Sequence, residues 1–441
     1  MLWVDKNKLY RFLIRKRFTA VTETERVLRS CPTRKDIELF QVQRFNEVWC
    51  DAWKNVPFYA EWRKQYDLPE TINGLSELTN WPILTKGNLR DLSKFERHDV
   101  PYPNAHIMTG GSTGEPVRLP AWGDPLSGAQ QVYARMAYGI NPGDRTFLLW
   151  GHEHLYGKGW RRSLNVYKRR FKDWLADWTR VSAYDLSSEA MQSAYNKFAS
   201  CRPKFVIGFS SAVLAFVRWN SQHAGEVKSV KAILCTAGPL SDEEREEIER
   251  FFGGRLCMEY GSVECGLMAH TRPSDGKYFV FWNTRLLQAV KQPDGEYKNV
   301  VTRLIRTYVP LIRYDIGDYL DLDSSEECDN ARSVLVANSI KGRPSEMISF
   351  KSGVSFFGAL IGDCVKQVHD VIASQIAVNE DGNYLEIRVT GQRKLAQEEL
   401  DLIKNRFELT VSNADKIHIS VVQVDALTTT AGGKTPRVMR I

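Results

Sequence analysis

Hydrophobic residues in the middle of the chain fall in short continuous runs that are separated by longer polar stretches. Clear runs cover residues 146–150, 205–208 and 232–235. Short uninterrupted apolar runs are typical of strands that are buried on both faces of a sheet. One intervening segment opens with acidic residues after Ser241, as the N-terminus of a helix does. This alternation over about residues 105–345 predicts an α/β domain.

The last part of the chain follows a different pattern. Strands at 372–378, 384–390 and 417–424, with a helix over 396–409, predict a small α+β unit. A Gly-Arg-Pro turn at 342–344 lies between the two patterns and is a reasonable domain boundary. We therefore expect a large α/β domain over 1–342 with mixed sheets and flanking helices, its first 100 residues mainly helical. We also expect a hinge at 343–346 and a small mobile domain over 347–441.

Segment Thr109–Pro116 concentrates three glycines and three hydroxyl side chains. Glycine lets the backbone approach a ligand closely, and hydroxyl and bare N–H groups are donors to phosphate oxygens. The segment is therefore a candidate polyphosphate-binding loop. Clusters of Gly, Ser and Thr are also common in plain turns, so the loop alone leaves both interpretations open.

Three further polar segments follow at wide spacing. In Glu259–Glu264 an aromatic ring, a glycine and carboxylates follow an apolar strand, which is suitable chemistry for a nucleobase and Mg²⁺. In Arg313–Asp318 a carboxylate after a glycine can accept both hydroxyls of a ribose, although Gly-Asp is also frequent in turns. Near the end, Lys434 lies in a Gly-rich segment. This segment is no Walker A loop, because Thr428 stands where its first glycine belongs.

Composition sets broad limits. The chain has 441 residues and a formal net charge of +7, with 43% hydrophobic residues, which suggests two or three globular domains. We see no apolar run near the ~20 residues of a membrane span and no secretory signal. Eight cysteines are scattered without a Cys-x-x-Cys pair. We therefore expect free thiols in the reducing cytoplasm rather than a zinc site or disulfides.

Basic residues gather in two places. One group lies between Lys158 and Lys172, and another, Arg11–Arg17, lies in an amphipathic stretch. Both could be solvated helix faces, or they could contact an anionic substrate, a lipid-linked sugar or a membrane surface. No motif indicates nucleic-acid binding.

The order and spacing of the polar segments resemble the superfamily of adenylate-forming enzymes, which includes acyl-CoA synthetases, luciferase and adenylation domains. The branch of phenylacetate–CoA ligase and capsule-biosynthesis proteins is the most similar. The resemblance covers nearly the whole chain. The segments that carry it are Pro82–Asp91, Thr109–Pro116, Gly238–Ser241, Tyr260–Glu264, Gly317–Asp318, Gly342–Arg343 and Lys434.

The resemblance implies an AMP-forming ligase. ATP and Mg²⁺ would convert a carboxylic acid to an acyl-adenylate, and the acyl group would pass to coenzyme A or an amine, in polysaccharide or secondary metabolism. It implies catalytic roles for Lys434 and Glu264, with Glu264 also as the Mg²⁺ ligand. The implied ATP contacts are Thr109, Gly110, Gly111, Ser112, Thr113, Gly114, Gly238, Pro239, Glu259, Tyr260, Gly261, Ser262, Asp318 and Arg343. A non-catalytic nucleotide-binding or scaffold protein on the same fold is the alternative.

The resemblance also implies a hinge at Glu346 and a pocket for the acid. Expected pocket residues are His152, His154, Phe209, Ser210, Thr236, Ala237 and Cys265. His152, Glu153 and His154 could serve as a polar substrate pocket, as ordinary loop residues, or, with less support, as metal ligands. The chain departs from the family pattern at three positions, with Arg118 in place of a lysine after the loop, Val263 in place of a hydroxyl residue, and Ile316 in place of a threonine.

Overall fold

The structure is a computed structural model. It describes residues 6–108, 118–122, 125–150, 159–183, 188–223, 227, 229–293, 295–322, 331–341, 347–358, 360–365, 368, 370–391, 393–411, 413–428 and 438–441. Within these ranges, no helix is both long and apolar enough to cross a membrane.

The first hundred residues are mainly helical, as predicted. The helices are α1 (Lys6–Leu13), α2 (Arg15–Ser30), α3 (Arg34–Asn55) and α4 (Pro57–Gln65), followed by the short 3₁₀ turns η1 (Leu75–Asn80), η2 (Asn88–Arg90) and η3 (Leu92–Phe95). Helix α3 begins at a capping box in which Thr33 and Asp36 satisfy each other's backbone N–H groups. Its buried side places Phe45 and Trp49 in the main hydrophobic core, which fixes the helical segment against the rest of the large domain.

An eight-stranded sheet forms the centre of the large domain, in the order β13-β9-β8-β7-β6-β5-β3-β4. Strands β4, β3, β5, β6 and β7 are parallel, whereas β8, β9 and β13 are antiparallel. The strands are β3 (Thr146–Leu149), β4 (Trp178–Val181), β5 (Phe205–Phe209), β6 (Ala232–Thr236), β7 (Arg255–Ser262), β8 (Gly266–Thr271), β9 (Tyr278–Val280) and β13 (Val336–Ala337). The strands predicted from the apolar runs are confirmed, and so is the α/β class.

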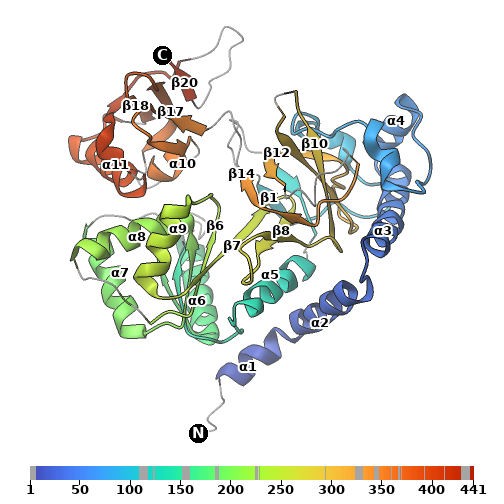
Figure 1. Ribbon diagram of the computed structural model, residues 1–441, viewed down its shortest axis with the longest axis horizontal. Helices are drawn as coiled ribbons and strands as arrows, with labels where there is room; N and C mark the ends of the chain where they lie inside the picture. Colours follow the sequence, from blue (N-terminus) through green and yellow to red (C-terminus); the bar gives the residue numbers. More distant parts are fainter. Residues whose placement is uncertain are drawn as a thin grey trace.

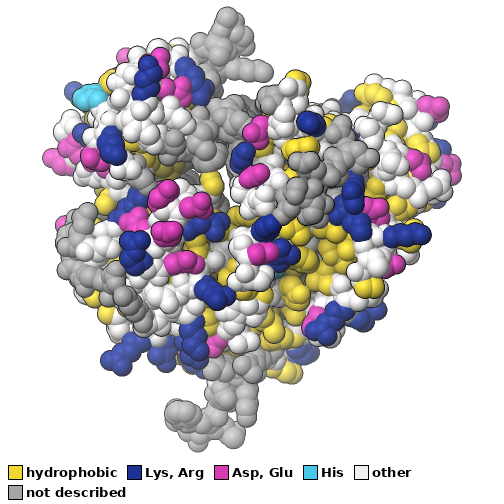
Figure 2. Space-filling model, viewed as in Figure 1, with side chains coloured by type: hydrophobic (Ala, Val, Ile, Leu, Met, Phe, Trp, Pro, Cys, Tyr) yellow, Lys and Arg dark blue, Asp and Glu magenta, His cyan; other side chains and the backbone are white. Residues whose placement is uncertain are grey.

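Helices cover the sheet (Figure 1). The parallel strands are connected by α6 (Gly159–Ala176), α7 (Ser188–Cys201), α8 (Ser210–His223) and α9 (Asp242–Phe252), and α5 (Pro125–Ala137) precedes β3. The predicted acidic start of α9 is confirmed, because Ser241 forms a capping box with Glu244. Figure 2 shows acidic side chains gathered over this helix.

A second, antiparallel sheet has the order β10-β11-β12-β14. Its strands are β10 (Arg285–Lys291), β11 (Tyr297–Arg303), β12 (Tyr314–Asp321) and β14 (Ser339–Lys341). Leu84, in the segment that carries part of the resemblance, pairs with Tyr314 at the start of β12 through two backbone hydrogen bonds. The N-terminal lead-in therefore holds the beginning of the strand that carries Asp318. A two-stranded hairpin, β1 (His106–Met108) and β2 (Arg118–Pro120), completes the large domain.

The C-terminal unit has its own hydrophobic core, whose buried members run from Ile348 to Ile419. It contains β15 (Met347–Ser349), β16 (Ser355–Phe357), α10 (Leu360–Val365), β17 (Val371–Asn379), β18 (Tyr384–Gly391), α11 (Gln397–Thr410), η6 (Ala414–Lys416), β19 (His418–Gln423) and β20 (Val438–Arg440). The predicted strand–strand–helix–strand order is confirmed. Strand β20, which pairs in parallel with β17, was not predicted.

The C-terminal unit lies beside α8 and α9 (Figure 1), and α11 packs on α8. Arg218 of α8 donates a 3.2 Å hydrogen bond to the carbonyl oxygen of Thr410, at the end of α11. The same guanidinium is paired with Glu244 and Glu247 of α9. Arg218 therefore links both helices of the large domain to the small unit.

Candidate functional site

The carboxyl ends of the parallel strands β5, β6 and β7 lie side by side and carry several predicted site residues. The Ser210 hydroxyl lies within hydrogen-bond distance of the carbonyl oxygens of Thr236 (3.2 Å) and Gly238 (2.7 Å). The Thr236 hydroxyl donates to the carbonyl oxygen of Glu259 at 3.1 Å. Ala237, between Thr236 and Gly238, has a φ of 68°, a conformation that costs a non-glycine residue free energy. Ligands bind at this edge in open α/β sheets.

A β-bulge shapes the end of β7. The register between β7 and β8 shifts between Tyr260 and Gly261, so that Met268 is the extra residue on β8. A Cβ atom at Gly261 would stand 2.6 Å from the carbonyl oxygen of Gly266, so only glycine allows this approach of the two backbones. Bulges of this kind redirect side chains and are frequent next to functional sites.

A second bulge lies in β12 of the other sheet. Its register with β11 shifts at Asn299, which faces the three residues Ile316–Asp318. Gly317 has φ of 87°, and its N–H donates to the Asp315 carboxylate at 2.9 Å. The Gly-Asp motif is therefore a bulge within a strand rather than a turn between strands, and the bulge sets the direction of Asp318.

The two bulges meet through their side chains. The Tyr260 hydroxyl donates a 2.8 Å hydrogen bond to the Asp318 carboxylate and accepts one of 3.1 Å from the Asn299 amide. Burial raises the pKa of Tyr260 well above its ordinary value, and the negative charge of Asp318 raises it further. The tyrosine therefore stays a neutral donor, and it joins two motifs that lie in different sheets.

Glu264 lies on the turn between β7 and β8, where it is largely buried. Its carboxylate accepts a 3.3 Å hydrogen bond from the Tyr314 hydroxyl, and its backbone carbonyl accepts one of 3.0 Å from Arg303. The described residues contain no cluster of three His, Cys, Asp or Glu side chains that could hold a metal ion. A single carboxylate fits Mg²⁺ that is bound mainly by substrate phosphates and water.

Glu259 lies on the opposite face of β7 from Tyr260, since successive side chains of a strand alternate. Its buried carboxylate pairs with the Arg135 guanidinium of α5 at 3.1 Å. This ion pair fixes α5 to the sheet. An ATP contact of the Glu259 side chain stays a prediction.

Two of the predicted pocket residues, Phe209 and Cys265, lie in different surroundings. Phe209 stacks obliquely on Trp150 with ring centroids 4.4 Å apart, at the ends of β5 and β3. Cys265 is fully buried in the main core, and burial raises the pKa of its thiol to about 12. Its N–H donates to the Ser262 hydroxyl at 3.0 Å, so these two residues brace the turn that carries Glu264.

Several predicted residues lie outside the described residues. They are Thr109, Gly110, Gly111, Ser112, Thr113, Gly114, His152, His154, Arg343, Glu346 and Lys434. Residues that flank two of these segments are described. Met108 and Arg118, on the two sides of the predicted phosphate loop, pair in the β1–β2 hairpin. Thr428 forms two hydrogen bonds with Gln375 of β17, and Val438 pairs with the next residue, Ile376. The chain on both sides of Lys434 is therefore attached to β17.

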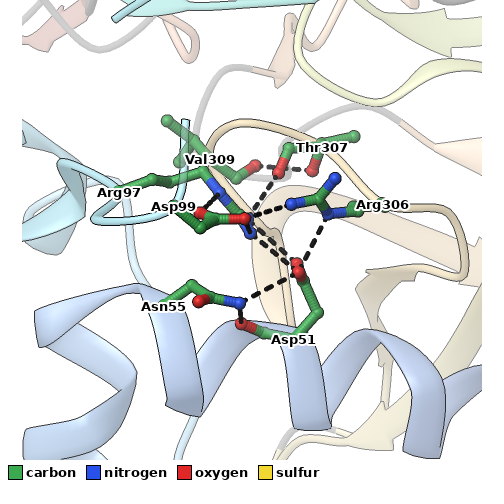
Figure 3. Close-up of polar contacts among 7 residues, drawn as sticks. All are labelled: Asp51, Asn55, Arg97, Asp99, Arg306, Thr307 and Val309. Atoms are coloured by element: carbon green, nitrogen blue, oxygen red, sulfur yellow. Dashed lines mark hydrogen bonds and ion pairs between the residues drawn. The ribbon is translucent and has the colours of Figure 1, made fainter. Parts of the chain in front are cut away.

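An ion-pair cluster lies at the base of the β1–β2 hairpin (Figure 3). Arg97 binds the carboxylates of Asp51 (2.7 and 2.9 Å) and Asp99 (2.9 and 3.1 Å), and Arg306 binds the same two carboxylates. Both guanidinium groups lie over the ring of Trp122, which follows β2 closely. The hydrogen bonds from Arg97 hold the pKa of Asp99 below its ordinary value.

Sequence reasoning did not find the residues that support the predicted ones. Asn299 and Arg303 reach the motifs from β11, and no local pattern marks them. Tyr314 lies within a segment that the sequence singled out, but its contact with Glu264 was not predicted. The Arg97 cluster draws on segments more than 200 positions apart.

No protein-family model matches the chain. The chain is 23% identical over 413 residues to Protein CapK of Staphylococcus aureus, covering 92% of this chain and 89% of that protein. It is 24% identical over 371 residues to phenylacetate-coenzyme A ligase of Escherichia coli (strain K12), covering 79% and 80%.

The fold of the chain is similar to that of solved structures. The chain resembles 2-hydroxyisobutyryl-CoA ligase in its postadenylation state with a TM-score of 0.58 and 14% identity, covering 93% of both chains. The same ligase in the thioesterification state gives the same score, with 93% of this chain and 91% of that chain covered. The predicted resemblance in sequence and the predicted fold class are therefore confirmed.

Proposed function

Since the chain shows the sequence pattern and fold of the adenylate-forming superfamily, in its phenylacetate–CoA ligase-like branch, we propose that it is an AMP-forming acid ligase. It binds ATP, activates a carboxylic acid as an acyl-adenylate and transfers the acyl group to coenzyme A. The observation that carries this proposal is the hydrogen bond between Tyr260 and Asp318. This bond joins the motif of Tyr260, proposed for adenine, to the motif of Asp318, proposed for ribose. The two motifs are far apart in the sequence but meet at the carboxyl edge of the parallel strands.

Each residue then has a chemical role in ATP binding. The Tyr260 ring lies along adenine beside the backbone of Gly238, and Asp318 and Arg343 hold the ribose hydroxyls. Ser112, Thr113 and the glycines of the loop hold the β- and γ-phosphates through their donors. These groups position the α-phosphate for attack by the acid's carboxylate, and positioning provides most of the catalysis in phosphoryl chemistry.

Two charged residues act on the reacting groups. Glu264 holds Mg²⁺, which neutralises charge on the phosphates. Lys434 bridges the acid's carboxylate and the α-phosphate, and so offsets the repulsion between two anions. The small domain, turning about Glu346, brings Lys434 in for adenylation and removes it for transfer.

The acid itself is proposed to be hydroxylated or anionic. His152 and His154 follow β3 in the sequence, and β3 pairs with β5, whose end carries Phe209 and Ser210. Imidazole groups near this edge would complement hydroxyl or carboxylate groups on the acid. Thr236 and Ala237 line the same edge of the sheet. If the purified protein activates phenylacetate as well as any hydroxy or sugar acid, this assignment of the acid is wrong.

An amine acceptor is a second candidate for the transfer step, because the resemblance to the capsule-biosynthesis branch allows an amide ligase. The two acceptors are separated by measuring AMP release with one acid, with coenzyme A or with amino sugars. A thioester product identifies coenzyme A, and an amide product identifies the amine.

The test of the proposed function is ATP–pyrophosphate exchange, screened over aryl, hydroxy, amino and uronic acids. Exchange that depends on an acid and on Mg²⁺ is the expected result. Lys434→Ala is expected to lower exchange by at least 100-fold with an unchanged melting temperature, whereas Lys404→Ala, which changes a partly exposed side chain of α11, keeps full activity. Protein that binds ATP but exchanges with none of the acids would instead favour a non-catalytic nucleotide-binding protein.

A further inference from the structure

Helix α6 presents an apolar stripe to solvent. Leu164, Tyr167, Phe171 and Trp174 recur at intervals of three and four residues, which places them on one side of the helix. All four are exposed, Tyr167 at 70% and Trp174 at 56%. A helix in a soluble enzyme normally turns such a stripe toward the core, so this stripe marks an interaction surface.

The charge around this stripe is of one sign. The segment 159–176 contains Arg161, Arg162, Lys168, Arg169, Arg170 and Lys172 and a single acidic residue, Asp173. Asp173 is buried and forms a bidentate ion pair with Arg180 of β4, 2.8 and 2.9 Å long. The one carboxylate of α6 is therefore neutralised inside the fold, and the charged side chains that the described part of the helix exposes are all basic.

Helix α1 extends the same surface. It packs against α6 (Figure 1), and Lys6 pairs with Asp177, just beyond the end of α6, at 2.7 Å. Phe12 and Leu13 are exposed, and the Arg15 guanidinium lies 4.2 Å from the centre of the Phe12 ring. Residues 6–22 contain no acidic residue. Aromatic and aliphatic side chains among Lys and Arg thus continue from one helix to the next.

We propose that the α1–α6 surface binds the face of an anionic phospholipid membrane. Tyr and Trp side chains favour the boundary between headgroups and acyl chains, and helices that lie in this boundary combine a basic face with exposed aromatic residues. Each Lys or Arg near an anionic surface strengthens binding roughly fivefold. The basic side chains select the charge of the membrane, and the apolar stripe enters the headgroup layer.

An acidic protein partner is the alternative occupant. A binding site for such a partner needs matched hydrogen bonds and a defined shape, whereas this surface offers long basic chains and projecting rings along two helices. These features match a fluid anionic layer better than a shaped protein surface. This inference does not rest on the proposed enzymatic function, because membrane binding is measured on the protein without acid or ATP.

The test is co-sedimentation of the full-length protein with phosphatidylcholine vesicles and with vesicles containing about one third phosphatidylserine. Binding only to the anionic vesicles, weakened at high salt, is the expected result. Lys168→Glu/Arg170→Glu/Lys172→Glu is expected to weaken it by at least 100-fold. Tyr167→Ser/Phe171→Ser/Trp174→Ser is expected to weaken it at least tenfold at unchanged charge.

Matched controls separate this result from unfolding. Lys351→Glu and Lys404→Glu reverse exposed charges in the small domain and are expected to leave vesicle binding unchanged. Circular dichroism and melting temperature report whether each variant is folded. Equal binding to neutral and anionic vesicles, no binding to either, or full binding by the charge-reversal variant would each overturn the proposal. If the protein instead dimerises as its concentration rises, and the dimer does not bind vesicles, the surface would be assigned to contact with a second copy of the chain.

Discussion

The Tyr260 hydroxyl donates its hydrogen bond to Asp318 across the junction of the two sheets, 58 positions apart in the chain. Both residues owe their directions to β-bulges, one at Gly261 in β7 and one at Gly317 in β12. Asn299 contributes a further hydrogen bond to the same hydroxyl. The proposed adenine and ribose motifs are therefore joined in one hydrogen-bonded unit.

Tyr260→Phe tests this unit. Loss of a donor to a carboxylate costs about 1.5–3 kcal/mol, and here it removes one of the contacts that orient Asp318 toward the proposed ribose site. We expect the KM for ATP to rise roughly tenfold or more, with a smaller change in kcat, measured by pyrophosphate exchange. Tyr59→Phe is the matched control, because its buried hydroxyl donates at 2.7 Å to the Pro310 carbonyl, away from Asp318. If both variants change KM equally, the hydrogen bond to Asp318 does not position the nucleotide.

The Arg97 cluster predicts non-additive stability effects. The Arg97 side chain is fully buried, so Arg97→Ala leaves Asp51 and Asp99 under-neutralised and is expected to cost about 3–5 kcal/mol. Arg306 is half-exposed, and Arg306→Ala alone is expected to cost about 1 kcal/mol or less. Because both arginines serve the same two carboxylates, the double variant should lose at least about 0.5 kcal/mol more than the sum of the single variants.

Urea unfolding measures these free energies. Arg44→Ala is the control for additivity, since Arg44 pairs with Glu47 within α3 and shares no partner with Arg97. Its combination with Arg97→Ala should be additive within about 0.5 kcal/mol. Strict additivity of the Arg97 and Arg306 variants would show that the cluster acts as separate pairs.

How much the sequence could predict depended on the range of the interactions. The strands at 205–208 and 232–235 were predictable because a buried parallel strand needs only a local run of apolar residues. The start of α9 was predictable because Ser241 and Glu244 cap it locally. The order of strands and helix in the C-terminal unit followed from the same local patterns.

Interactions between distant segments could not be predicted. A bulge at Gly261 or Gly317 depends on which strand lies opposite, and a sequence taken alone does not show the pairing. Strand β20 is three residues long and follows a glycine-rich segment. Its sequence pattern therefore does not differ from that of an irregular C-terminal segment. The motif residues were recognisable because their order resembles a family, whereas supporting residues such as Asn299 carry no motif.

Arg218 predicts a measurable link between the large domain and the C-terminal unit. Arg218→Ala removes its hydrogen bond to the Thr410 carbonyl at the end of α11. We expect faster amide exchange in α11 and in the facing turn of α8, because docking of the two helices weakens. The rates of adenylation and of acyl transfer should change by different factors if, as proposed, the small domain takes a different orientation in each step.

The control for this variant is Arg250→Ala, whose ion pair with Glu246 lies within exposed α9. It should leave the exchange in α11 and both rates unchanged. Equal amide exchange in Arg218→Ala and in the unmodified protein would show that the contact does not restrain the C-terminal unit.

His270 predicts a loss of stability in acid. It is buried among Tyr133, Phe279 and Phe281, and this burial lowers its pKa to about 4. Above pH 6.5 the ring is neutral in both states. As the pH falls from 6.5 toward 4, the unfolded chain binds the proton first, so the free energy of unfolding decreases, by about 3 kcal/mol in all.

His270→Phe should remove this component, because phenylalanine fits an aromatic environment and binds no proton. The Thr271 carbonyl loses the His270 Nδ1–H donor but keeps the Tyr138 hydroxyl at 2.9 Å. Urea unfolding at pH 7.5, 5.5 and 4.5 should show the variant losing less stability than the unmodified protein in acid. Tyr138→Phe, which alters the same carbonyl without removing the imidazole, should keep the original slope. A slope in His270→Phe as steep as in the unmodified protein would assign the acid sensitivity to other groups.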